Sequence, residues 1–143
     1  MTRILCAIRG GPESEETISR AVSLAEELDA RLIFLYVVNL DLIPSSSSVR
    51  VESIAKELSR MGEFILLMAQ ARAASEGVAA DTFVRQGNIP EQIWEACRDL
   101  HAETLIMGKP RDGNNKSFFS EIEQDAFVKK MQRDGEIKVI IEG

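Results

Sequence analysis

The residues with the clearest chemical potential lie in one basic, amide-rich stretch, residues 108–117. Gly108 ends an apolar run, and the stretch after it is rich in cations and hydrogen-bond donors. Cations, side-chain amides and glycine backbone are the groups that hold a phosphate or another anion. The candidate contacts are Gly108, Lys109, Arg111, Gly113, Lys116 and Ser117, with Asn114 and Asn115 as further donors.

The elements on either side determine where this loop lies. The apolar run 104–107 predicts a strand, and the spacing over 118–131 predicts a helix. Where a parallel strand feeds a helix, free backbone N–H groups and the positive end of the helix dipole converge on an anion. The predicted site therefore also takes in residues at or just past other strand ends, namely Arg9, Gly10, Val38 and Met107. The alternative is a solvated connection in which Ser117 or Ser120 caps the helix.

Strand and helix patterns alternate along the whole chain. This order predicts one α/β domain over residues 1–143, with a single open parallel sheet and helices on both faces. Pro44 and a run of four serines mark residues 39–48 as a loop. The predicted strands are 3–8, 32–38, 78–84, 104–107 and 137–141, and the predicted helices are 12–28, 51–77, 90–100 and 118–131.

Two elements carry further predictions. Apolar residues in the long helix step by three and four, so we expect its stripe to face the core, including Met61, Ile65 and Met68. The last strand offers a dimer seam if it lies at a sheet edge, because edge backbone is unpaired. The seam residues are Val139, Ile140 and Ile141.

Composition narrows the function. The 143 residues carry a formal charge of −6, with 45% hydrophobic and 28% charged residues. An acidic chain has no global electrostatic reason to bind nucleic acid or an anionic membrane. The apolar runs are far shorter than the ~20 residues of a membrane span, and the start leaves no room for a signal peptide. We expect a cytoplasmic protein with reduced cysteines.

No enzyme constellation is visible. Cys97 and His101 share a helical face, which suits either a metal pair or a nucleophile and base. Two ligands do not complete a metal site, and Cys97 also shares the apolar stripe of Ile93 and Leu100. We therefore predict a buried thiol, no metal and no catalytic residues.

The order of elements and four local strings resemble the universal stress protein family. The strings lie at 4–8 with 21–25, at 87–93, at 103–108 and at 139–141. The resemblance implies a Rossmann-like, adenine-nucleotide alpha-hydrolase-like fold with strand order 3-2-1-4-5 and dimers through the last strand. In one subfamily it also implies ATP in the loop after strand four, held by glycine, two residues, glycine, nine residues, glycine, then serine or threonine.

This chain departs from that ATP pattern. Gly108 keeps the first glycine, Arg111 stands at the second, and Arg9 replaces the usual aspartate after strand one. The final pair falls on Glu121 and Ile122, or on Asp125 and Ala126 when counted from the last strand; Ser117 or Ser120 could serve in a shortened loop. We predict a non-catalytic stress-response or adaptor module with a degenerate ATP loop. The alternative is an ATP or AMP sensor, or slow ATPase, that uses the remodelled loop 108–120.

Overall fold

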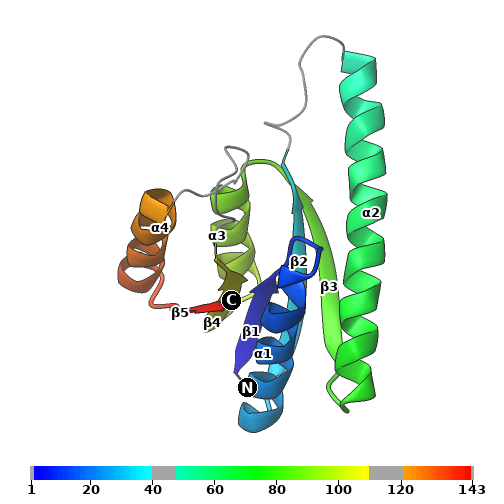
Figure 1. Ribbon diagram of the computed structural model, residues 1–143. Helices are drawn as coiled ribbons and strands as arrows, with labels where there is room; N and C mark the ends of the chain where they lie inside the picture. The colour runs from blue at the N-terminus through cyan, green and yellow to red at the C-terminus, as the bar shows by residue number, and fades with distance from the viewer. Residues whose placement is uncertain (1, 40–47, 110–120, 143) are drawn as a thin grey trace.

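The computed structural model describes residues 2–39, 48–109 and 121–142, and strands and helices alternate through these ranges (Figure 1). The serine-rich segment 40–47 lies outside them. The strands are β1 (Arg3–Ala7), β2 (Arg31–Val38), β3 (Ala80–Gln86), β4 (Thr104–Gly108) and β5 (Lys138–Glu142). The helices are α1 (Glu13–Leu28), α2 (Ser48–Ser75), α3 (Ile89–Asp99) and α4 (Glu121–Asp134).

The strands form one parallel sheet in the order β3-β2-β1-β4-β5, as predicted. β1 lies at the centre, and its Ile4 pairs with Leu32 of β2 on one side and with Thr104 of β4 on the other. The chain places β2 and β3 on one side of β1 and then returns to place β4 and β5 on the other side. The sheet order thus reverses between β1 and β4, and such a point opens a crevice at the carboxyl ends of the strands.

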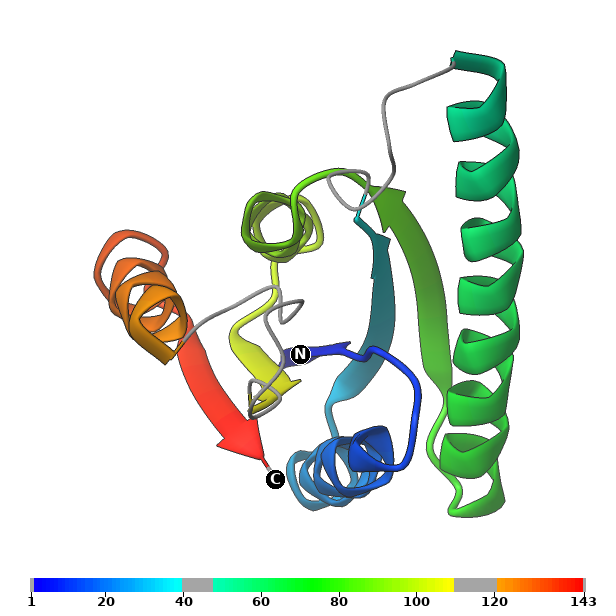
Figure 2. The ribbon, with the colours of Figure 1, turned by 45° about the horizontal axis from the view of Figure 1, so that its top comes forward.

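Helices cover both faces of the sheet, which explains why its central strands are largely apolar after their first residues. α1 and α2 lie on one face, and α3 and α4 lie on the other (Figure 2). Alternate residues of each strand serve the two layers: Ile4 and Cys6 pack beneath α1 and α2, whereas Leu5 packs beneath α3 and α4. Asn88 caps α3, its side chain accepting a hydrogen bond from the Glu91 backbone N–H at 3.1 Å.

The expected core stripe of α2 is wrong at two positions. Met61 and Met68 are 55% and 60% exposed, and Ile65 is half-buried. The buried face consists of Leu66 and small residues, namely Ala55, Gly62, Ala69 and Ala73. These small residues let the helix axis approach the sheet closely, so the large side chains counted in the period lie beside or outside the contact.

β5 forms one edge of the sheet in the described part of the chain. It pairs with β4 on its inner side, and Val139, Ile140 and Ile141 are all half-buried. The predicted position of the seam at a sheet edge is confirmed. Its use in a dimer stays a prediction.

Candidate functional site

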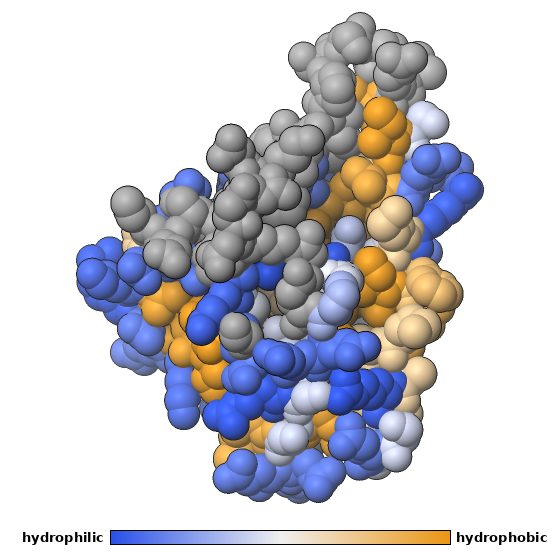
Figure 3. All heavy atoms as spheres, in the orientation of Figure 1, coloured by the Kyte–Doolittle hydropathy of each residue, from blue (hydrophilic) through white to orange (hydrophobic). Residues whose placement is uncertain are grey.

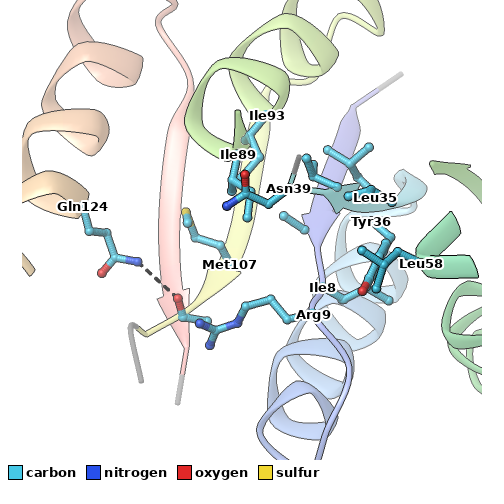
Figure 4. A pocket seen from close by; sticks show the side chains of 14 residues that line it. Ile8, Arg9, Leu35, Tyr36, Asn39, Leu58, Ile89, Ile93, Met107 and Gln124 are labelled. Carbon is cyan, nitrogen blue, oxygen red and sulfur yellow. Dashed lines mark hydrogen bonds between the residues drawn. The ribbon is translucent and has the colours of Figure 1, made fainter. Parts of the chain in front are cut away.

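A pocket opens at the carboxyl ends of the central strands, where the sheet order reverses (Figure 4). Three neighbouring strands supply its floor, and one residue of α2, two of α3 and one of α4 supply its walls. The lining residues described are Ala7, Ile8, Arg9, Leu35, Tyr36, Val37, Val38, Asn39, Leu58, Ile89, Ile93, Met107, Gly108 and Gln124.

Most of this lining is apolar. Val38 and Met107 are buried at the ends of their strands, and Ile89 and Ile93 are buried in the first turns of α3. Such a surface suits a flat, weakly polar group, such as an aromatic base, better than a free phosphate. The apolar part of the pocket lining would therefore bury an uncharged part of a ligand rather than bind a charged group.

Arg9 is the one fully charged side chain among the described residues of the lining. It extends across the pocket from the end of β1 toward the end of β4, and its Nη2 donates a 2.7 Å hydrogen bond to the Lys109 carbonyl. A Cβ built on Gly108 would lie 3.2 Å from the same nitrogen and 3.3 Å from Thr17 Oγ1. The missing side chain of Gly108 thus makes room for Arg9 and α1.

The end of β4 is held from two further directions. Gln124 of α4 is buried and donates from its side-chain amide to the Gly108 carbonyl at 3.2 Å. The Lys109 N–H donates to the Glu142 carbonyl of β5 at 3.1 Å. The Arg9 and Gln124 side chains and the β5 backbone therefore position the point where the chain enters residues 110–120.

The structure brings together four of the predicted site residues. Arg9, Val38, Met107 and Gly108 all line the pocket, and Lys109 follows at its rim with an exposed side chain. Gly10 does not line it; with φ +83° it forms the turn after β1, and a Cβ there would lie 2.7 Å from Ile65 Cδ1. The predicted contacts Arg111, Gly113, Lys116 and Ser117 lie outside the described residues.

Sequence reasoning missed two polar groups of the pocket. Asn39 directly follows β2, where it was assigned to a loop. Gln124 lies three residues before the buried Phe127, on the same face of α4. A glutamine inside an apolar stripe is a signal that could have found it, because a buried amide needs a hydrogen-bond partner.

The cysteines and His101 lie apart from this pocket. Burial raises the pKa of the Cys97 thiol to about 12 and raises the pKa of Cys6 further, so both thiols are protonated and unreactive at neutral pH. His101 is exposed beyond the end of α3. The described residues contain no cluster of three His, Cys, Asp or Glu side chains that could hold a metal ion.

The fold and the pocket define a class: a Rossmann-like α/β protein with a largely apolar pocket where its sheet order reverses. Residues 1–130 match the universal stress protein family. The chain belongs to the universal stress protein family, as its sequence resemblance predicted. A similar relative is universal stress protein C of Salmonella typhi, 27% identical over 128 residues, which cover 89% of this chain and 93% of the relative.

Solved structures of the family share the fold. Universal stress protein UspA from Lactobacillus plantarum superposes with a TM-score of 0.80 at 15% identity, covering 99% of this chain and 97% of that one. The universal stress protein from Archaeoglobus fulgidus in complex with dAMP superposes with a TM-score of 0.64 at 13% identity, covering 100% and 98%. That protein therefore holds an adenine nucleotide on the same fold.

Proposed function

We propose that this chain is a non-catalytic stress-response module of the cytoplasm, acting as an adaptor, and that its pocket no longer holds ATP in the manner of the family's ATP-binding members. The observation that carries the proposal is the position of Arg9. Its guanidinium bonds to the Lys109 carbonyl and lies against Gly108, the glycine that would otherwise let backbone approach a ligand. Arg111 at the second glycine position supports the same conclusion.

The chemistry of the lining supports a non-catalytic role. The described lining residues include no carboxylate, thiol or imidazole that could move a proton or attack a phosphorus atom. Arg9, the Asn39 and Gln124 amides and the Tyr36 hydroxyl can bind and orient a ligand but form no acid and base pair. The described side chains of the pocket can therefore bind a ligand but are not suited to catalyse a reaction on it.

The test is to ask what the purified protein carries. Protein that has been washed extensively is denatured in acid, and the released small molecules are analysed by mass spectrometry. We expect no ATP or AMP at a stoichiometric level and no phosphate release from added ATP above a no-protein blank. Recovery of one ATP per chain, or steady phosphate release, would contradict the proposal.

The second candidate is an adenine-nucleotide sensor. An apolar pocket beside one cation favours it, because the two parts fit a base and a phosphate, and a related structure holds dAMP. ATP or AMP would then raise the melting temperature, and Arg111→Ala would remove much of the increase. Arg133→Ala is a matched control, since Arg133 is exposed on α4 and pairs with the neighbouring Asp134. The absence of any shift at millimolar nucleotide rules this candidate out.

A further inference from the structure

The outer surface of α2 carries large apolar side chains that the fold does not cover. Met61, Phe64, Leu67 and Met68 are 55%, 63%, 59% and 60% exposed. Figures 1 and 2 show α2 as the outermost element of its flank, and the space-filling view in Figure 3 shows apolar colour running along it. We call these four residues the α2 patch.

The α2 patch is large for a protein surface. Its four side chains leave about 500 Å² of apolar area in water, within the 300–600 Å² of the largest patch on a typical monomer, which is often functional. An isologous contact that covered the patch on two copies would remove about 1,000 Å² of apolar surface, and its polar rim would add to this. Specific protein interfaces bury about 1,200–2,000 Å² in total, so the patch would supply most of the smallest such interface and its rim the rest.

The spacing of the patch matches helix-on-helix packing. Met61, Phe64 and Met68 step by three and four, and the exposed Ala71 and Ser75 continue the same line toward the end of the helix. Steps of three and four keep one line of residues facing a partner helix along its length. Large residues thus occupy the first half of the line, and small residues occupy the second half.

This gradient of size suits a second copy in antiparallel orientation. A two-fold axis between Phe64 and Met68 sets Phe64 of each copy against Met68 of the other. It also sets Met61 against Ala71 of the second copy, so that the outer methionine of each helix meets a small residue while Phe64 and Met68 pack against each other near the axis. Leu67 lies beside the axis and meets its own equivalent, as a two-fold interface requires.

We propose that the α2 patch is an interface with a second copy of this chain, formed by antiparallel packing of the two α2 helices about a two-fold axis near Leu67. The interface lies on the opposite flank of the sheet from β5. It is therefore a surface separate from the predicted strand seam.

Sedimentation across a concentration series, from micromolar to several hundred micromolar, tests the interface. Phe64→Glu places a charge opposite Met68 of the second copy and is expected to raise the dissociation constant at least roughly 30-fold. Leu28→Glu is the matched control, since Leu28 is 48% exposed at the end of α1 and outside the patch. A chain that is monomeric throughout, or an assembly that Phe64→Glu leaves unchanged, overturns the proposal.

Cross-linking tests the geometry independently of any other seam. Leu67→Cys places two thiols beside the axis, and a short bifunctional maleimide is expected to join them. Ser53→Cys is exposed on the same side of α2, yet its two copies would lie roughly 40 Å apart at 1.5 Å per residue, so it should not cross-link. The native Cys6 and Cys97 are buried and do not compete. Equal cross-linking of the two variants, or none with Leu67→Cys, contradicts the antiparallel arrangement.

Discussion

At the scale of single residues, Arg9 connects β1 and β4 beyond the last residue pair of their ladder, Ala7 and Met107. Its hydrogen bond to the Lys109 carbonyl connects the end of β1 to the residue after β4. We expect Arg9→Ala to lower the free energy of unfolding by about 1 kcal/mol, a typical contribution for one hydrogen bond of this kind. Urea denaturation measures the change, and hydrogen exchange at Lys109 should speed up locally. The pairing would be unimportant if Arg9→Ala changed stability no more than Arg133→Ala.

The buried Cys97 thiol makes the free energy of unfolding decrease at alkaline pH. Burial raises its pKa to about 12, whereas an unfolded thiol titrates near about 8.5. Above that lower value the unfolded chain loses a proton that the folded chain keeps, so stability falls as pH rises toward the folded pKa, by up to about 1.4 kcal/mol per pH unit. Urea unfolding at about pH 8 and about pH 10 should show a shallower loss for Cys97→Ala than for the parent chain. Equal losses would mean that the thiol is not protected.

At the scale of elements, Gly62 decides how closely α2 approaches the sheet. A Cβ at this position would overlap Tyr36 Cδ1 of β2. Gly62→Ala should therefore destabilise the protein by about 1–3 kcal/mol, although alanine favours a helix interior by about 1 kcal/mol. Thermal and urea unfolding give the value. In a Tyr36→Val background the ring is gone, so the same substitution should become neutral or stabilising, and equal effects in both backgrounds would refute the clash.

α2 also shows where prediction from sequence succeeds and fails. Its existence and length follow from apolar steps of three and four, but those steps pass through Met61 and Met68, which are exposed. Two apolar lines run along the helix, and the buried line is built partly of Gly62 and alanines, which carry little hydrophobic signal. How closely a helix can approach a sheet depends on the size of its residues, and a count of hydrophobic residues does not include that size.

The pocket, too, could be predicted from sequence only in part. Hydrophobic periodicity shows which residues lie at strand ends, and Arg9, Val38, Met107 and Gly108 do gather at one edge of the sheet. The hydrogen bond from the Gln124 side chain to Gly108 could not be predicted in this way. It depends on how α4 packs against the sheet, and that packing is set by contacts between residues distant in sequence. The strand order itself came from the family resemblance, because alternating strands and helices alone do not determine it.

At the scale of the whole molecule, the two surfaces proposed to bind a second copy lie on opposite flanks. α2 covers β2 and β3, and β5 forms the other edge of the sheet (Figure 2). Two different isologous contacts on one chain can both be filled, and they then give a closed tetramer or an open chain. Each contact needs its own disrupting variant.

The backbone of β5 shows which residue disrupts the strand seam without harming the fold. The Lys138 N–H donates to the Glu103 carbonyl, and the Glu142 carbonyl accepts from Lys109, so both residues turn toward β4. Main-chain groups of parallel strands alternate in direction, which leaves Val139 and Ile141 turned to the open edge. Val139→Pro removes an outward N–H and is tolerated at an edge, whereas Ile140→Pro removes a bond to β4 and should destabilise the chain.

Four proteins then separate the contacts by mass in light scattering. If both surfaces are used, the parent chain exceeds a dimer. Phe64→Glu leaves a dimer joined through β5, and Val139→Pro leaves a dimer joined through α2. The variant with both substitutions is expected to be a folded monomer, because Phe64 is exposed and the Val139 N–H is turned away from β4. A dimer that persists in the double variant would place the contact elsewhere on the molecule. It would refute both the α2 interface and the β5 seam.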